Sequence, residues 1–406
     1  MNWLVDFDRL RSEEGSNQKE IVLRAKEIIE SGKDNQSIVI KGPAGTGKTL
    51  VLAHIALQVP DKNGFFFVYT HSLRKFLSSA FRDANQGLTS GLSINNFHKY
   101  LFDLYKNTFH ESPPPITSFD EKTDLMMDKI SSRIRNKIFD YVLIDEGQDF
   151  SPKTISFLRS ISKVMVFVGD GNQAIYVKHD INLTNLTQLL GQPESHNLKL
   201  SMRISPSLIK LLYPYISRIE EYKKGLKFLN KKNENGEVRD SKPLWFRDVD
   251  YDSFIKYFAE NLVMDYIRSG KNIVIACYHN EDVKKVSEKL SELLQPEFIV
   301  LVTKDREDEI DFSESKIYLI TMHSSKGLEF DNLLYLHINS APIDDKDGLY
   351  DNLAYTVYTR PKEDLIIYSP DKNIPLKSMM NLDHITIVET LDLDSADEDI
   401  DEIKIF

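Results

Sequence analysis

The chain has 406 residues, of which 41% are hydrophobic and 28% charged, a globular composition that excludes disorder as the main state. Its formal net charge of −11 excludes a protein that coats nucleic acid with a broad basic surface, because such binding depends on neutralising phosphates. The first residues lack the basic flank and apolar run of a signal peptide, and no stretch is long and apolar enough to span a membrane. We therefore expect a cytoplasmic protein.

Short apolar runs rich in β-forming residues alternate with helical stretches along the whole chain. In the first half they are 37–41, 65–69, 140–144 and 164–168. In the second half they are 244–246, 272–277, 298–302, 316–321, 333–338 and 365–368. This alternation predicts parallel sheets wrapped by helices, and two α/β domains fit it better than one very wide sheet.

The expected organisation is a first domain over residues 1–195, a second over 196–383 and an acidic tail over 384–406. The region 100–135, with Pro113-Pro114-Pro115, is interpreted as a small insertion in the first domain. The tail ends in an apolar tip that could dock into a basic, apolar pocket of a protein partner, although a disordered end is the simpler reading. The single cysteine, Cys277, lies in an apolar run and is predicted to be a buried, inert thiol.

A phosphate-binding loop follows the first predicted strand. The residues Gly42-Pro43-Ala44-Gly45-Thr46-Gly47-Lys48-Thr49 lead directly into a helical stretch, which is the context that a Walker A loop requires. Its glycines let backbone N–H groups surround a triphosphate, Lys48 neutralises the outer phosphates, and the Thr49 hydroxyl completes the shell of Mg²⁺. The sequence thus predicts ATP and Mg²⁺ as cofactors.

Two adjacent carboxylates stand at the end of the predicted strand 140–144, where parallel sheets place functional groups. Asp145 is predicted to hold Mg²⁺ through water, together with Thr49. Glu146 is predicted to orient and deprotonate the attacking water. A solvated turn is the alternative interpretation, but an apolar strand that leads into acids after a Walker A loop argues against it.

The motifs in chain order resemble those of the UvrD/Rep-like branch of superfamily 1 helicases. The second motif is Asp145-Glu146-Gly147-Gln148-Asp149, and the third runs from Val168 to Tyr176. The segment similar to the fifth motif is Thr321-Met322-His323-Ser324-Ser325-Lys326-Gly327-Leu328-Glu329-Phe330. The segment similar to the sixth is Ala354-Tyr355-Thr356-Val357-Tyr358-Thr359-Arg360. The resemblance implies two RecA-like P-loop domains in tandem with parallel sheets and an ATP site at their interface.

The resemblance also implies roles for residues that no spacing would single out. Gln173 would sense the γ-phosphate, and Arg203 and Arg360 would reach it from the second domain, since a guanidinium offers two parallel donors to the charge of phosphoryl transfer. Gln18 would read the adenine edge, which its amide can match with one donor and one acceptor. Gly327 and Glu329 of the fifth motif would contact the nucleotide.

Further motifs resemble those that line the family's nucleic-acid channel. The implied contacts are Thr70, His71, Ser72, Phe97, His98, Tyr176, Thr321 and His323. Phosphates would accept hydrogen bonds from the polar side chains, and Phe97 could stack on a base. For Phe97 and His98, packing against the sheet as core is the alternative.

The chain departs from the family in size and in stacking residues. Little room remains for the two large inserted subdomains of the family, so the resemblance is to a minimal form. Tyr176 is followed by Val177 where the family has a stacking tryptophan, and Pro361 after Arg360 predicts that the arginine is presented from an extended turn.

Three functions remain open from the sequence. The first is a single-strand translocase or helicase, 3′ to 5′ and on DNA rather than RNA by the resemblance. The second is an ATP-gated binding subunit of a larger complex with little motor activity of its own, which the small size favours and the full motif set disfavours. The third is a small-molecule kinase, which would need a substrate lid that the sequence does not show.

Overall fold

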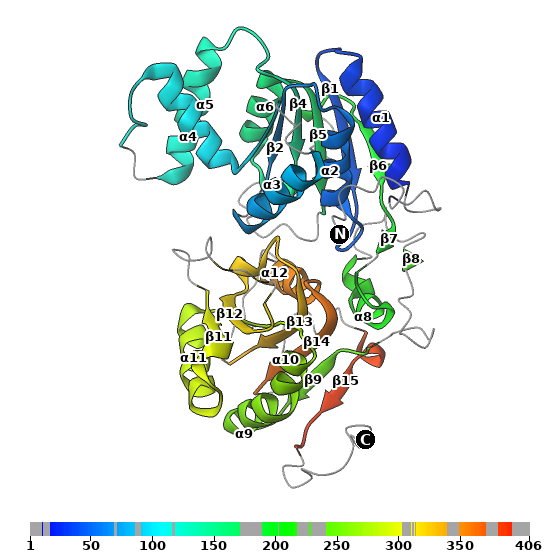
Figure 1. Ribbon diagram of the computed structural model, residues 1–406, viewed down its shortest axis with the longest axis vertical. Helices are drawn as coiled ribbons and strands as arrows, with labels where there is room; N and C mark the ends of the chain where they lie inside the picture. Colours follow the sequence, from blue (N-terminus) through cyan, green and yellow to red (C-terminus); the bar gives the residue numbers. More distant parts are fainter. Residues whose placement is uncertain are drawn as a thin grey trace. The chain divides into compact units, whose positions relative to one another are not determined.

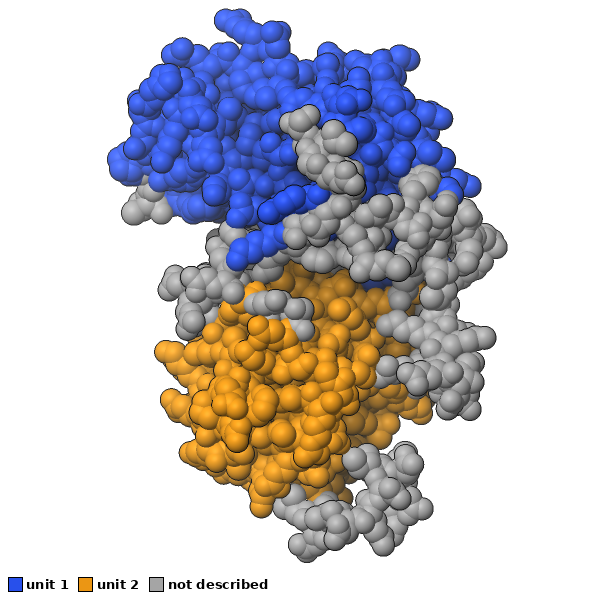
Figure 2. Space-filling view, in the orientation of Figure 1, with its two compact units in different colours: residues 1–200, 225–227 blue, residues 201–224, 228–406 orange. Residues whose placement is uncertain are grey.

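The chain forms two compact units in the computed structural model. Unit 1 contains residues 1–200 and 225–227, and unit 2 contains residues 201–224 and 228–406 (Figure 2). The structure describes residue 10 and residues 17–68, 71–85, 91–115, 118–170, 189–201, 203–216, 227–228, 241–302, 310, 312, 314–338, 349–370 and 381–391. No helix in these ranges combines the length and apolar character needed to cross a bilayer.

Unit 1 is built on a parallel sheet of six strands (Figure 1). The strands are β1 (Gln36–Lys41), β2 (Gly64–Phe67), β3 (Leu92–Asn95), β4 (Phe139–Ile144), β5 (Ser162–Gly169) and β6 (Glu194–Asn197). Their order is β3-β2-β4-β5-β1-β6, and each neighbouring pair is parallel. One strand, β5, therefore lies between β1, which leads into the phosphate loop, and β4, which leads into the acidic pair.

Helices cover both faces of this sheet. They are α1 (Gln18–Glu30), α2 (Lys48–Gln58), α3 (His71–Asn85), α4 (Phe97–Phe109), α5 (Phe119–Arg133) and α6 (Pro152–Ile161). Because side chains alternate along a strand, Ile38 and Ile40 of β1 pack under α1 and α2, whereas Val39 faces the core that α4, α5 and α6 share. Both faces of the sheet are consequently buried, as a continuous apolar strand requires.

The predicted insertion of the first domain is the helix pair α4 and α5. Asn96 caps α4 by accepting a hydrogen bond from the His98 N–H at 2.9 Å, and Ser118 caps α5 by accepting one from the Glu121 N–H at 3.4 Å. The two helices pack on α6 and the sheet through Leu101, Met126 and Ile130, all fully buried. The insertion is therefore part of the core of unit 1.

Unit 2 contains a second parallel sheet, of seven strands. The strands are β9 (Leu244–Arg247), β10 (Ile273–Cys277), β11 (Ile299–Leu301), β12 (Ile317–Thr321), β13 (Phe330–Leu336), β14 (Pro361–Ser369) and β15 (Thr386–Val388). Their order is β11-β12-β10-β13-β14-β9-β15, and every neighbouring pair is parallel. A separate two-stranded pair joins β7 (Leu200–Ser201) to β8 (Lys227–Phe228).

The helices of unit 2 are α8 (Pro206–Ile216), α9 (Tyr251–Tyr257), α10 (Met264–Arg268), α11 (Asn280–Leu293) and α12 (Leu349–Tyr358). A π-helical segment, Phe258–Val263, joins α9 to α10. This helical run and α11 pack on one face of the sheet, where Cys277 is fully buried among apolar side chains. Burial raises the pKa of the Cys277 thiol far above its usual value, as expected of an inert core cysteine.

The predicted fold class, two parallel-sheet α/β domains in tandem, is confirmed. Five short strands of the described residues were not predicted: β3, β6, β7, β8 and β15. The last of these corrects the predicted start of the tail at residue 384, because Thr386–Val388 pairs with β9 as the edge strand of the sheet. The acidic segment 392–406 lies outside the described residues.

Candidate nucleotide and nucleic-acid site

The phosphate loop of unit 1 joins β1 to α2 and depends on glycine at several positions. Gly45 and Gly47 adopt left-handed backbone angles, with φ of 75° and 79°, and Gly47 is the N-cap residue of α2. A Cβ on Gly42 would lie 2.6 Å from the Thr46 hydroxyl and 3.1 Å from Leu198. The backbone of the loop thus lies close to Leu198. The loop curves around the N-terminus of α2, and a helix N-terminus is a favourable place for an anion.

Lys48, Thr46 and Gln18 meet at this loop. The Lys48 ammonium donates to the carbonyls of Gly42 at 2.8 Å and Pro43 at 3.1 Å. Thr46 donates through its hydroxyl to the Pro43 carbonyl at 2.9 Å, and the Gln18 amide donates to the Thr46 carbonyl at 2.9 Å. The structure therefore places Gln18 against the phosphate loop, although 28 positions separate it from Thr46. Its adenine-reading role stays a prediction.

The predicted metal-binding pair is brought together at the end of β4. The Thr49 hydroxyl donates to Oδ2 of Asp145 at 2.8 Å, and Asp145 is only 3% exposed. Burial, with the neighbouring Glu146 carboxylate as the second cause, raises the pKa of Asp145 to about 7, against the smaller opposing effects of Thr49 and Lys48. A bound cation would stabilise the ionised Asp145 carboxylate, because its positive charge offsets both the burial and the repulsion from Glu146.

Glu146 is held by a residue to which the sequence assigned no role. Its backbone is left-handed, with φ of 50°, which is uncommon for a residue other than glycine. The Gln148 amide donates to Oε2 of Glu146 at 2.6 Å, and its oxygen accepts from the Asp170 N–H at 3.2 Å. Gln148 therefore fixes the candidate base and ties it to the first residue after β5, where the third motif continues.

Two glycines make this arrangement possible. A Cβ on Gly147 would lie 2.1 Å from the buried Phe167 ring, and one on Gly169 would lie 2.7 Å from the Gln148 amide oxygen. A larger side chain at Gly147 would displace the buried Phe167 ring, and one at Gly169 would displace the Gln148 amide that positions Glu146. The sequence signal that could have identified Gln148 is its place two residues after Glu146 in the short turn Gly147–Asp149.

Substituting Gly147 by alanine is expected to destabilise the protein by about 1–3 kcal/mol, because the new methyl group overlaps the Phe167 ring. Urea unfolding followed by circular dichroism measures this loss. The double variant Gly147→Ala/Phe167→Leu removes the clash and should be more stable than the sum of the two single changes predicts. Strict additivity of the two changes would contradict this packing.

In unit 2 the predicted arginines lie with Glu329. Arg203 donates to the Glu329 carboxylate and, at 2.9 Å, to the Thr359 carbonyl, while Arg360 donates through Nε to the Thr356 carbonyl at 2.9 Å. Arg203, with Lys362 and Arg360 as weaker contributors, lowers the pKa of Glu329. Two arginines and one carboxylate of three separate motifs thus converge, and their action on ATP stays a prediction.

The local backbone agrees with two expectations about these motifs. Helix α12 ends at Tyr358, and β14 begins at Pro361, so Arg360 lies in the non-helical link that the proline predicts. Gly327 has φ of 76°, a left-handed angle that suits glycine. Arg360 is 4% exposed, and its position is therefore set by packing as well as by hydrogen bonding.

Phe97 lies in the core, where base stacking does not fit. It is 2% exposed and packs between Phe67, Phe150 and Phe157, with ring centroids 5.5–6.4 Å away. The correction has a simple cause: Phe97, Leu101 and Tyr105 are spaced by four and form the buried stripe of α4. His98 is partly exposed, its ring lies 4.7 Å from that of Phe119, and burial lowers its pKa.

A row of planar side chains lies at the carboxyl ends of three neighbouring strands in unit 2. The strands β12, β10 and β13 are adjacent, and Cys277 pairs with both Thr321 and Leu336. The residues just beyond these ends are Tyr278, His279, His323 and His337. The Tyr278 ring lies 4.6 Å from that of His279, 6.1 Å from that of His323 and 5.0 Å from that of Tyr350.

Exposure distinguishes the members of this row. His279 and His323 are exposed and Tyr278 and His337 partly exposed, whereas Tyr350 is 7% exposed and packs against the Tyr278 ring. The Thr321 hydroxyl donates to the Ser324 hydroxyl at 3.1 Å. Of the predicted nucleic-acid contacts, His323 is therefore accessible, and Tyr278 and His337 are neighbours that the sequence did not identify.

Some predicted site residues lie outside the described part of the chain: Gln173, Tyr176 and Thr70. For His71 and Ser72 the structure describes only the backbone, at the start of α3. Within the described residues no group of three histidine, cysteine or acidic side chains could hold a metal ion. The oxygen pair Thr49 and Asp145 nonetheless fits Mg²⁺, which is typically held by one or two protein oxygens together with the phosphates of the substrate.

Comparisons with known proteins agree with the placement of the phosphate loop. Residues 25–179 match the family model of the AAA domain, which includes the phosphate loop, the acidic pair and β5. No curated protein sequence matches the chain. The matched segment therefore lies within unit 1 and contains both predicted nucleotide motifs.

Two solved structures are similar to the chain at low identity. The helicase nonstructural protein 10 of an arterivirus is 14% identical with a TM-score of 0.43, over 88% of this chain and 64% of its own. The C-terminal domain of a possible DNA helicase from Lactobacillus plantarum is 15% identical with a TM-score of 0.34, over 46% of this chain and 98% of its own. The chain thus spans 64% of the length of the arterivirus protein.

Proposed function

We propose that the chain is an ATP-hydrolysing motor of helicase superfamily 1 that moves along single-stranded nucleic acid. The observation that carries the proposal is the constellation in unit 1: Thr49 bonded to Asp145, beside Glu146 held by Gln148. These residues lie at the carboxyl edge of a parallel sheet, within the segment that matches the AAA domain model. Their types and contacts fit the hydrolysis of a nucleoside triphosphate.

Each group of the site has a definite task in this proposal. Bound ATP with Mg²⁺ supplies the phosphoanhydride that is cleaved and the positive charge that the phosphates require. Lys48 and the N–H groups of the loop hold the phosphates, while Thr49 and Asp145 hold the cation. Glu146 orients a water molecule and accepts its proton, which requires a carboxylate fixed in one rotamer. The Gln148 amide fixes the rotamer by donating a hydrogen bond to Oε2 of Glu146.

The nucleic-acid part of the proposal is supported by the row of rings at β12, β10 and β13. Aromatic and imidazole side chains stack on bases of any identity, so a row of them suits movement along a strand. The chain is acidic overall, with a net charge of −11, which favours stacking over phosphate attraction as the source of affinity. DNA as the preferred strand, 3′ to 5′ movement and the UvrD/Rep-like branch rest on the motif resemblance.

Removing the Tyr278 ring is expected to weaken single-strand binding. Tyr278→Leu should raise the dissociation constant for an oligothymidine by about 5- to 150-fold, because a stacked base contributes about 1–3 kcal/mol. Fluorescence anisotropy measures this change, and thermal melting controls for the lost contact with Tyr350. Tyr278→Phe keeps the ring and should bind normally. Equal affinity of the leucine variant would remove Tyr278 from the strand path.

Translocation and its direction can be tested with end-blocked strands. A single strand that carries biotin and streptavidin at one end is incubated with the protein and ATP, and release of streptavidin is followed. A 3′ to 5′ motor releases streptavidin from the 5′ end and leaves the 3′ block in place. Release from neither end, with ATP hydrolysis intact, would favour the ATP-gated binding subunit, and release from the 3′ end would reverse the direction.

A further inference from the structure

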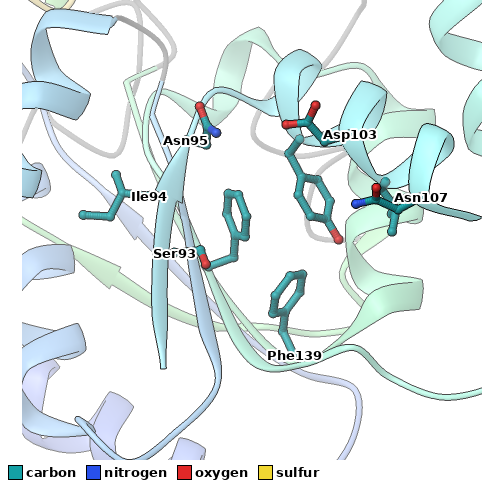
Figure 3. Close-up of a pocket in the computed structure, with 9 residues that line it drawn as sticks. Ser93, Ile94, Asn95, Asp103, Asn107 and Phe139 are labelled. Atoms are coloured by element: carbon teal, nitrogen blue, oxygen red, sulfur yellow. The ribbon is translucent and has the colours of Figure 1, made fainter. Parts of the chain in front are cut away.

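A pocket in unit 1 lies beside the edge strand β3, away from the phosphate loop (Figure 3). Its volume is about 420 Å³, within the range of pockets that bind small molecules or side chains. The lining residues come from β2, β3, β4 and α4: Phe65, Ser93, Ile94, Asn95, Tyr100, Asp103, Leu104, Asn107 and Phe139. The proposed hydrolysis does not use this pocket, although Ser93, Ile94 and Asn95 belong to a segment that resembles a nucleic-acid motif of the family.

One wall of the pocket is aromatic. The Phe65 ring lies 4.6 Å from that of Tyr100 and 5.4 Å from that of Phe139, and the Tyr100 and Phe139 rings are 5.8 Å apart. Figure 3 shows Asp103 and Asn107 on α4, across the pocket from Ser93 and Asn95 on β3. The pocket thus combines flat apolar surface with carboxylate, amide and hydroxyl groups.

Three polar side chains of α4 that line the pocket lack partners within the described residues, whereas the Asn95 amide oxygen on β3 accepts from the Asn96 N–H at 3.0 Å. The Tyr100 hydroxyl is buried without a hydrogen bond, and the exposed Asp103 carboxylate and Asn107 amide form no ion pair or hydrogen bond with described residues. Farther along the same helix, Tyr105 donates to Glu111 at 2.7 Å and accepts from Lys129 at 3.0 Å. Buried hydroxyls are nearly always bonded, so the pocket is the place on α4 where a group from another molecule would complete the bonding.

The charge of the pocket selects its occupant. Asp103 lies among the nine lining residues, and no lysine or arginine is among them. Phosphate and carboxylate groups are therefore disfavoured, and a cation is favoured. A guanidinium satisfies every feature at once: its plane stacks on an aromatic wall, and its N–H groups donate to a carboxylate, an amide oxygen and a phenol oxygen.

The position of the pocket indicates what carries this guanidinium. In the described sheet β3 is the edge strand and pairs only with β2. An edge strand offers backbone groups to an extended peptide, whose alternate side chains enter neighbouring pockets. We propose that β3 and this pocket form a docking site for an extended, arginine-bearing segment of a partner protein. The net charge of −11 favours such a basic partner.

The test uses isothermal titration calorimetry with two synthetic peptides. The first is acetyl-Thr-Val-Arg-Val-Thr-amide, and the second carries citrulline, the uncharged analogue, in place of arginine. The arginine peptide should bind at least about tenfold more tightly, the effect expected of a charge-assisted hydrogen bond. Asp103→Asn should abolish this preference, and Tyr100→Phe should weaken binding severalfold while it keeps the ring.

The control variant is Glu20→Gln, which removes an exposed carboxylate from α1 and should leave peptide binding unchanged. Thermal melting and unchanged ATP hydrolysis would show that each variant is folded. Equal binding of the two peptides, or no heat at millimolar peptide, would overturn the proposal. The proposal would also be overturned if oligothymidine displaced the arginine peptide and Tyr100→Phe weakened binding of the oligonucleotide instead. That result would assign the pocket to a nucleic-acid base.

Discussion

Replacing Glu146 by glutamine is expected to lower the turnover of ATP by about 100- to 10,000-fold, the contribution typical of a general base. The amide has the same shape and can still meet the Gln148 side chain, whose N–H₂ lies 2.6 Å from Oε2. It cannot accept the proton of the attacking water. Nucleotide affinity should therefore be retained while kcat is lost.

The measurement pairs steady-state hydrolysis with binding of a fluorescent ATP analogue. Gln148→Leu serves as the matched positioning variant, because it removes the amide that fixes Glu146 and leaves the carboxylate in place. It should lower kcat by about tenfold with little change in KM, as expected when a group acts only in the transition state. If Glu146→Gln hydrolysed ATP at the normal rate, the base would be another residue and the proposed task of Glu146 would be wrong.

Replacing Thr49 by valine is expected to lower hydrolysis by about 100-fold, which corresponds to about 2.7 kcal/mol of transition-state stabilisation. Valine has the shape of threonine but lacks the hydroxyl that donates to Asp145 at 2.8 Å. The change removes a cation ligand and leaves a buried carboxylate without its donor. The variant should need more Mg²⁺ for half-maximal rate, and Thr49→Ser, which keeps the hydroxyl, should restore most of the activity.

Two further readouts separate this effect from misfolding. Thr49→Val should lose about 1–3 kcal/mol of stability, because Asp145 is 3% exposed and loses a hydrogen bond there. Its melting curve should nevertheless stay cooperative. An unchanged Mg²⁺ requirement in the valine variant would show that the hydroxyl does not serve the cation and would leave it a structural role in holding Asp145.

The strands that surround the motifs were predictable because they are apolar and β-branched. The apolar run at β1 is followed directly by the glycines of the phosphate loop, and β4 is followed directly by the acidic pair. Composition and position before a motif therefore both indicated a strand. The unpredicted strands are short. In β6, Glu194–Asn197 contains no apolar residue, and its pairing with β1 comes from the tertiary structure alone.

The site was predictable where contacts are local or carried by a motif. Lys48, Thr49 and Asp145 belong to motifs with a known physical purpose, and the structure brings Thr49 and Asp145 into contact across 96 positions. The ion pair of Arg203 with Glu329 spans 126 positions, and no pattern in either segment indicates the partner. Phe97 is different, because its spacing from Leu101 and Tyr105 already indicated burial.

The most direct test of the motor proposal is the rate of ATP hydrolysis with and without single-stranded DNA or RNA. The full chain is compared with Lys48→Ala and Glu146→Gln under identical conditions. The proposal predicts slow hydrolysis alone, strong stimulation by single-stranded DNA, and loss of both rates in the two variants. Negligible hydrolysis with every strand would contradict an autonomous motor, and stimulation that survives in Lys48→Ala would contradict the assignment of the phosphate loop.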